Sequence, residues 1–125
     1  MSANATITAP FGDGRHEFRL GIAQLEEHDR LCDAGPEFVM HAILNGSWRT
    51  PYIRETIRLG LVGGGTDPMT ALVLTDAYAG PGQLMGLKSL AVNILGAALV
   101  GPAGETEGDP SGEPKGETDP SPEDD

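Results

Sequence analysis

The stretch TPYIRETIRLGLVGGG, Thr50–Gly65, predicts the helix around which the rest of the chain is organised. Thr50 can cap a helix, and Pro51 suits a first turn because its missing N–H would be unpaired there anyway. Every fourth residue that follows is a large aliphatic one, and this spacing places a single apolar stripe on a 3.6-residue helix. The stripe consists of Ile53, Ile57 and Leu61. We therefore expect a packed helix at the centre of the domain.

The triplet Gly63, Gly64 and Gly65 predicts the end of this helix. Glycine adopts a positive φ without the steric penalty of a Cβ atom, which is why it so often terminates helices. Three glycines in a row also predict a flexible hinge between this helix and the next one.

The N-terminal part of the chain predicts a β-hairpin. Polar and apolar residues alternate within Ala5–Ala9 and within Glu17–Leu20, and the turn-forming sequence Phe11–Gly14 separates the two runs. Ile7, Phe18 and Leu20 are the side chains expected to face inward. A lone hairpin is unstable in water, so we expect this one to pack against helices.

Four more helices follow from apolar periodicity and from Gly and Pro punctuation. They are predicted at Ile22–Ala34, Glu37–Asn45, Pro68–Ala79 and Leu84–Val100. Their expected inner faces are, in order, Ile22, Leu25, Asp29 and Cys32; Phe38, Val39, Ala42 and Ile43; Met69, Leu72, Val73 and Ala77; and Leu87, Leu90, Ala91, Ile94, Leu95 and Ala98. Trp48 is expected to hold its loop against the core. The last helix is apolar on more sides than a surface helix needs.

Composition divides the chain into two parts. Residues 102–125 contain nine acidic residues, one lysine and no large apolar side chain, and they carry −8 of the net charge of −11. Such a segment has too little to bury to offset the entropy of ordering itself. The predicted fold class is therefore mainly α: a small domain of about five helices with an N-terminal β-hairpin at residues 1–101, and a disordered acidic tail at 102–125.

Several classes of protein are excluded at this stage. A single cysteine rules out an internal disulfide, and no Cys/His cluster has zinc spacing. The acidic balance opposes nucleic-acid binding, which relies on an excess of Lys and Arg. The N-terminus lacks the basic start and apolar run of a signal peptide, and Lys88 and Asn93 interrupt the most apolar segment. We expect a cytoplasmic protein that neither spans a membrane nor binds nucleic acid.

No catalytic, cofactor or metal site is expected. The glycines of Gly60–Gly65 lack the lysine and Ser/Thr of a phosphate-binding loop and have no strand before them. His28 and Cys32 stand one helical turn apart and His41 follows, so a nucleophile pair or a metal site is conceivable. A lone cysteine is more often simply buried, and an enzyme is the least favoured of the functional hypotheses.

The order of elements resembles the gene-transfer-agent family of tail assembly chaperones, found in prophages and gene-transfer-agent clusters. The segments that carry the likeness are Glu17–Leu20, Ile22–Glu27 with Cys32–Gly35 behind it, Gly46–Trp48, Ile53–Gly65, Ala71–Tyr78 and Ala91–Gly101. The most specific of them is the arginine-bearing helix that ends in Gly-Leu-Val-Gly-Gly-Gly. The acidic tail lies outside the likeness.

The resemblance implies a non-enzymatic protein that keeps the tape-measure protein soluble and helps the tail tube polymerise around it. Such a protein is absent from the finished particle; a homo-oligomer is possible. The alternative is a structural minor tail or connector component. A chaperone needs exchangeable apolar surface. The residues expected to bind the partners are Ile53, Ile57, Leu61, Leu87, Leu90, Ile94 and Leu95, with Gly63, Gly64 and Gly65 as the hinge that lets the helices part.

Overall fold

The computed structural model describes residues 5–101. The acidic tail expected at 102–125, and with it the domain boundary, lies outside the described residues. The elements are β1 (Ile7–Phe11), β2 (Gly14–Phe18), α1 (Ile22–Cys32), α2 (Pro36–Asn45), α3 (Thr50–Gly63), α4 (Pro68–Tyr78), the 3-10 turn η1 (Met85–Leu87) and α5 (Lys88–Val100). A mainly α domain with five α-helices and an N-terminal hairpin, as the sequence predicts, is confirmed for the part of the chain that is described.

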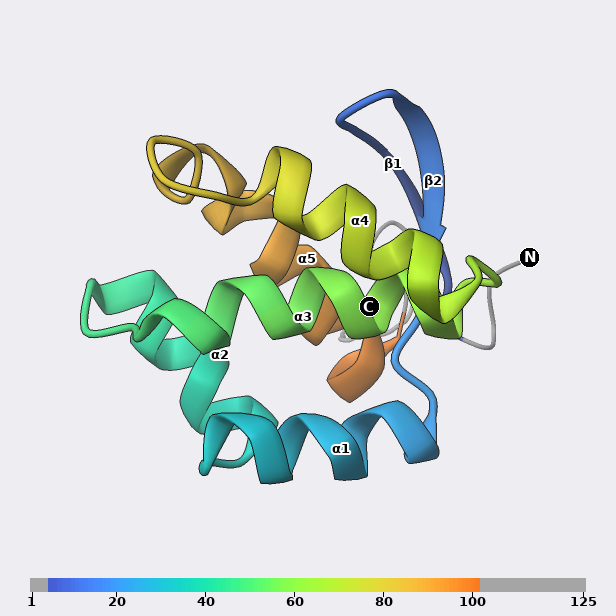
Figure 1. The fold of residues 1–125 in the computed structure, drawn as a ribbon. Coiled ribbons are helices and arrows are strands. Elements are labelled where there is room, and N and C mark those ends of the chain that lie inside the picture. Colours follow the sequence, from blue (N-terminus) through green and yellow to red (C-terminus); the bar gives the residue numbers. More distant parts are fainter. Residues whose placement is uncertain (1–4, 102–125) are drawn as a thin grey trace, which may run out of the picture.

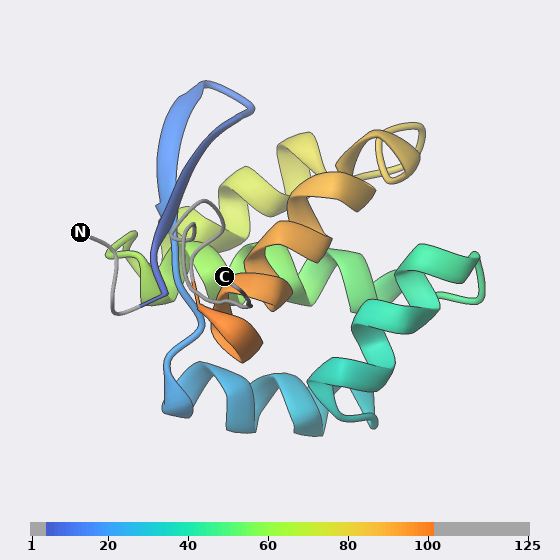
Figure 2. The same cartoon turned by 180° about the vertical axis from the view of Figure 1, so that it is seen from behind.

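Helix α3 is the centre of the molecule, as its sequence predicts. It contacts α1, α2, α4, α5 and β2. In Figure 1, α4 and α1 lie on opposite sides of α3 and α5 runs behind it; Figure 2 shows the same order from the back. The neighbours cover α3 on all sides but one.

The predicted apolar stripe of α3 is confirmed. Ile53, Ile57 and Leu61 have no exposed area. The helix buries more than this stripe, and the additional buried residues are Tyr52, Thr56, Leu59 and Gly60. The predicted cap is wrong by one position: Arg49 is the N-cap residue and makes no side-chain capping bond, so Thr50 already belongs to the helix. Pro51 occupies the first turn as expected.

The hairpin packs on the helical body through β2 on α3 and β1 on α5. Its strands pair antiparallel, with Ile7 opposite Phe18 and Phe11 opposite Gly14. Gly12 begins the two-residue turn with a φ of 58°, as a type II′ turn requires. Phe18 and Leu20 are buried as predicted and Ile7 is half-buried. Phe11, which the sequence assigns to the turn, is instead a buried residue at the end of β1.

At the end of α3, Gly63 and Gly64 are required by a close backbone contact rather than by a positive φ. Only Gly65 has a positive φ, at 114°. A Cβ atom on Gly63 would overlap the carbonyl oxygen of Arg19, and one on Gly64 would overlap that of Glu17. The main chain between β2 and α1 therefore runs directly against the end of α3. The Arg19 N–H also donates to the Gly60 carbonyl oxygen at 2.9 Å.

The predicted inner face of α1 is confirmed at Leu25 and Cys32 and wrong at Ile22 and Asp29. Ile22 is 72% exposed and Asp29 is exposed, whereas His28 is buried with Cys32. The physical reason is a hydrogen bond across the helix interface, described below, that gives the His28 Nε2 a buried partner on α3. Helix α1 also ends at Cys32 rather than Ala34, because Asp33 takes a left-handed conformation with a φ of 54°.

The predicted inner face of α4 is wrong throughout. Met69, Leu72, Val73 and Ala77 all face solvent, and Ala71, Leu74 and Thr75 pack inward. This helix carries aliphatic residues around most of its circumference, so periodicity alone does not select a face. The start is correct, because the Asp67 carboxylate accepts the N–H groups of Met69 and Thr70.

The faces of α2 and α5 are largely confirmed. In α2, Val39, Ala42 and Ile43 are buried and only Phe38, 62% exposed, departs from the prediction. Gly46 ends α2 with a φ of 87°. The segment predicted as one helix from Leu84 begins with the separate turn η1 before α5. Trp48 is partly buried and packs on the core, as expected of it.

Candidate protein-interaction surface

The core holds most of the residues that the sequence assigns to partner binding. Ile53, Ile57, Leu61 and Leu95 have no exposed area and Ile94 is 1% exposed. Only Leu87 and Leu90 are partly accessible. A partner could reach the other five only if α5 and α3 separated, and both that separation and the hinge at Gly63–Gly65 stay predictions. In this conformation, the accessible apolar surface lies elsewhere.

The first such surface is the outer face of α4. It is formed by Met69, Leu72 and Val73, which are spaced three and four residues apart and so stand next to one another on the helix. Met69 is 67% exposed and Val73 59% exposed. Sequence reasoning found these residues but placed them in the core. Three adjacent large apolar side chains facing water on one helix make α4 a candidate interaction surface.

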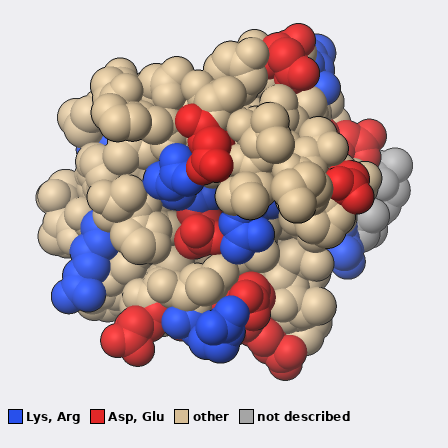
Figure 3. Space-filling view, viewed as in Figure 1, with Lys and Arg blue, Asp and Glu red and all other residues tan. Residues whose placement is uncertain are grey.

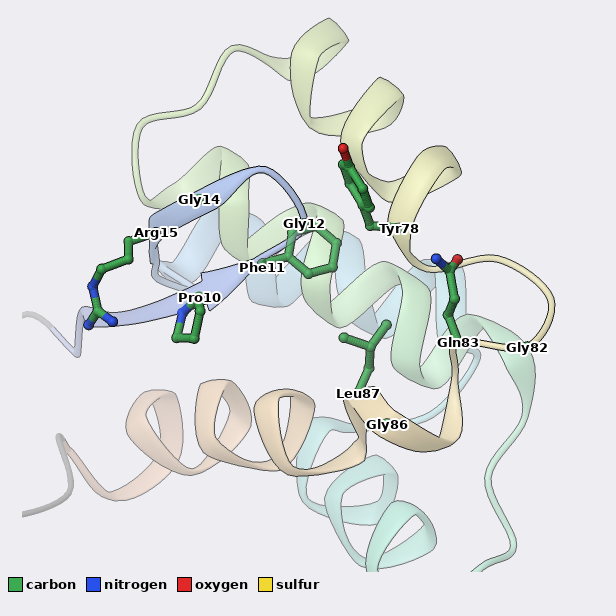
Figure 4. A pocket seen from close by; sticks show the side chains of 10 residues that line it. All are labelled: Pro10, Phe11, Gly12, Gly14, Arg15, Tyr78, Gly82, Gln83, Gly86 and Leu87. Atoms are coloured by element: carbon green, nitrogen blue, oxygen red, sulfur yellow. The ribbon is translucent and has the colours of Figure 1, made fainter.

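The second surface is a groove between the hairpin and the chain that joins α4 to α5. It has a volume of about 630 Å³ and opens to solvent. Figure 4 shows the lining residues, with Pro10, Phe11 and Arg15 on the hairpin side and Tyr78, Gln83 and Leu87 opposite. Four glycines complete it, Gly12, Gly14, Gly82 and Gly86. We call this feature the hairpin groove.

Both walls of the hairpin groove are held in place by contacts within the protein. The rings of Phe11 and Tyr78 meet edge to face, with centroids 6.0 Å apart. Gly12 presses so closely on Tyr78 that a Cβ atom would overlap the ring. On the other side, the Gln83 side-chain oxygen accepts the Gly80 N–H at 2.7 Å. The groove is thus formed before any partner arrives.

Sequence reasoning missed the hairpin groove. Its walls come from residues more than sixty positions apart in the chain, and no local pattern joins them. The one available signal was the density of glycines around Phe11 and around Leu87, which sequence analysis attributes to turns alone.

The exposed side of α3 carries a band of ion pairs and no apolar patch. Arg58 pairs with Glu55 at 2.5 Å, Arg54 pairs with Asp76 of α4 at 2.6 Å, and Arg30 pairs with Glu27 on α1. Figure 3 shows blue and red side chains interspersed among uncharged ones on the face seen in Figure 1. Arg54 also donates to the carbonyl oxygen of Ala79 and so ties α3 to the end of α4. Each of these arginines has its own carboxylate, which leaves no excess positive charge for a phosphate backbone.

His28 and Cys32 do meet, but their surroundings do not suit a nucleophile. The Thr56 hydroxyl donates to the Tyr52 carbonyl oxygen at 2.6 Å, so its oxygen accepts the His28 Nε2–H at 2.8 Å. Burial lowers the pKa of His28 and raises the pKa of Cys32 to about 12, which keeps the sulfur as a thiol. His41 is not part of this group, because it lies on the surface of α2 near Glu37. The cluster is a buried polar contact between α1 and α3.

Two further observations concern the described residues only. No group of three or more His, Cys, Asp or Glu side chains within residues 5–101 could hold a metal ion. Helices of the length and apolarity needed to cross a bilayer are likewise absent from that range.

The fold and these surfaces define a small helical protein with a preformed groove and accessible apolar side chains, a combination suited to contacts with other proteins. A family model described as "Phage tail tube protein, GTA-gp10" matches residues 4–101. The chain belongs to this family of phage and gene-transfer-agent tail proteins. The tail family expected from the sequence is thus confirmed, and the chaperone role within it is a separate question. No curated protein and no solved structure matches the chain.

Proposed function

We propose that this protein is a non-catalytic tail assembly chaperone that binds the tape-measure protein and assists assembly of the tail tube. It acts in the cytoplasm of the bacterial host and leaves before the particle is complete. The observation that carries the proposal is the outer face of α4, where Met69, Leu72 and Val73 stand in water. A chaperone must cover apolar segments of another chain and then release them, which needs apolar surface that the fold itself does not consume.

The chemistry of the rest of the molecule supports this proposal. Cys32 is a buried thiol rather than a thiolate. The arginines of the exposed band are neutralised by neighbouring carboxylates. Contacts driven by apolar burial need neither nucleotide nor metal and persist in salt, which screens charges over about 10 Å at 0.1 M.

The test is co-expression of the full chain with the tape-measure protein of its own gene cluster. We expect the soluble fraction of the tape-measure protein to rise with the wild-type chain and to fall with Leu72→Asp or Val73→Asp. The matched control is Ile22→Asp, because Ile22 is also an exposed aliphatic residue but lies on α1, across α3 from α4. Solubility that is independent of this protein would overturn the proposal, and equal loss with the control would remove α4 as its site.

A structural role in the tail tube is the second candidate, and the description of the matching family favours it. The two roles differ in the finished particle. Mass spectrometry of purified particles should find a structural subunit in stoichiometric amount and a chaperone only in traces. A stoichiometric amount in the particle would replace the chaperone by the structural role.

A further inference from the structure

We propose that the hairpin groove is the docking site for a partner segment that carries apolar side chains next to a carboxylate. This inference rests on the proposed function, since the partner meant is the protein that the chaperone holds. It goes further by placing the contact on named residues and by stating the chemistry that the contact selects.

The apolar part of the specificity comes from the groove floor. Leu87 faces the gap from the wall opposite the hairpin, as Figure 4 shows, and Pro10 and Tyr78 add exposed apolar lining. Phe11 is only 4% exposed and contributes mainly by holding the Tyr78 ring in place. This apolar surface is exposed to water, and covering it with aliphatic or aromatic side chains of a partner is favourable. Because the walls are already braced by the Phe11–Tyr78 and Gln83–Gly80 contacts, docking orders little of this chain.

The charged part comes from Arg15 at one end of the groove. Among residues 5–101, the Arg15 side chain has neither an ion pair nor a hydrogen bond, unlike Arg54, Arg58 and Arg30. It is exposed and stands beside Pro10 in Figure 4. An arginine at the rim of an apolar groove favours a ligand that brings a carboxylate to that end, because electrostatic complementarity sets orientation and excludes basic segments.

Other occupants fit this combination less well. The acidic residues 102–125 would satisfy Arg15 but contain no large apolar side chain to fill the groove. A nucleic acid needs several unpaired cations, and the groove offers one.

Addition of a partner strand to the hairpin is also disfavoured. Phe11 and Gly14 close a two-residue turn and so form a hydrogen-bonded pair. The next pair, Pro10 and Arg15, is then a non-hydrogen-bonded pair, so the backbone nitrogen of Pro10 points away from β2, toward the outer edge of β1. Proline has no N–H to offer an added strand. The partner is therefore expected to contact side chains in the groove rather than the edge of the sheet.

Two glycines allow the groove to be filled without disturbing the fold. Gly86 and Gly14 line it, neither has a positive φ, and a Cβ atom on either would meet nothing within 4 Å. Gly96 on α5 has the same open surroundings but is not part of the groove. Gly86→Phe and Gly14→Phe therefore fill the groove, and Gly96→Phe is the matched control.

The experiment measures binding of overlapping peptides from the tape-measure protein to the full chain by fluorescence anisotropy. We expect Gly86→Phe and Gly14→Phe to weaken binding about tenfold or more and Gly96→Phe to leave it within about twofold. Arg15→Glu should weaken binding of peptides with a carboxylate, whereas Arg49→Glu, which changes an exposed arginine outside the groove, should not. Thermal unfolding of each variant verifies that it is folded.

The outcomes separate this inference from the proposed function. Tight peptide binding that neither filling variant weakens leaves the chaperone proposal standing and overturns the groove as its site. Absence of binding to the wild-type chain overturns both. If the wild-type chain self-associates without peptide and the filling variants abolish that association, the occupant is a second copy and the present assignment is wrong.

Discussion

At the residue scale, whether an aliphatic side chain is buried depends on whether it belongs to α3 or faces it. Ile57 on α3 has no exposed area, whereas Val73 on α4, of similar chemistry, faces water. Both are aliphatic residues in helices. Only their place in the packed structure separates a core residue from a surface residue.

Ile57→Ala should destabilise the protein by about 2–5 kcal/mol, because it removes buried methyl groups and leaves a cavity beneath the neighbouring helices. Val73→Ala is the control and should change the free energy of unfolding by less than about 0.5 kcal/mol. Urea unfolding at constant slope gives both values. A loss below about 1 kcal/mol for Ile57→Ala would contradict its position in the core.

Because His28 is buried, we expect the free energy of unfolding to fall in mild acid. In the unfolded chain its pKa is near the ordinary value of 6.5, and in the fold burial lowers it. Above 6.5 both states are neutral and His28 has no effect; below it the unfolded state binds the proton and the folded state resists it. Stability is therefore lost from about pH 6.5 downward to the lowered pKa, by at most about 1.4 kcal/mol per pH unit.

The measurement is urea unfolding of wild type and His28→Gln between pH 7.5 and 5.5. The variant removes the titrating group, so its stability should change less over this range. His41→Gln is the control, because His41 lies on the surface of α2. An unchanged slope in His28→Gln would show that another group carries the pH dependence.

At the element scale, the fold depends on how closely the chain between β2 and α1 approaches the end of α3. Gly63 and Gly64 allow that approach because they have no Cβ atom, and the hydrogen bond from the Arg19 N–H to the Gly60 carbonyl oxygen stabilises it. The hairpin is thereby attached to the central helix by backbone contacts as well as by the buried Phe18. The same glycines that end the helix therefore also join two elements.

Gly63→Ala should lower the melting temperature, because the new methyl group would overlap the Arg19 carbonyl oxygen and force the chain away from α3. Gly96→Ala is the matched control in a helix with open surroundings, and it should raise stability by about 0.5–1 kcal/mol. Differential scanning calorimetry of both variants checks this. A stabilising Gly63→Ala would indicate that the contact with Arg19 is loose and would favour the hinge instead.

At the scale of the whole molecule, the family match and the described fold coincide at residues 4–101 and 5–101. The apolar surfaces that we assign to partners, on α4 and in the hairpin groove, both belong to this part. The strongly acidic composition belongs to the remainder of the sequence. The exposed apolar surfaces and most of the negative charge are thus separate along the chain.

A chain that ends at Gly101 should keep its cooperative thermal transition and its affinity for tape-measure peptides, because residues 102–125 hold no large apolar side chain. Its solubility at high concentration should fall as the net charge drops. Circular dichroism melting and light scattering measure the two properties. Loss of the thermal transition would mean that the acidic segment contributes to the fold.

The sequence by itself determined the elements and their order, because start and stop residues and apolar spacing are local properties. Pro51, Asp67, Gly46 and the stripe from Ile53 to Leu61 all have the roles that these patterns predict. Local patterns also identified α3 as the central helix, since it has the clearest amphipathic face.

Only the tertiary structure decided which sides of α1 and α4 are buried and where an accessible groove exists. In α4 aliphatic residues surround the helix, so periodicity does not select a buried face. Packing against α3 buries Ala71 and Leu74 and leaves Met69 and Val73 exposed to solvent. In α1 the hydrogen bond from His28 to Thr56 made a polar residue part of the interior. The hairpin groove joins Phe11 to Leu87, and contacts between such distant positions depend on packing that no local pattern encodes.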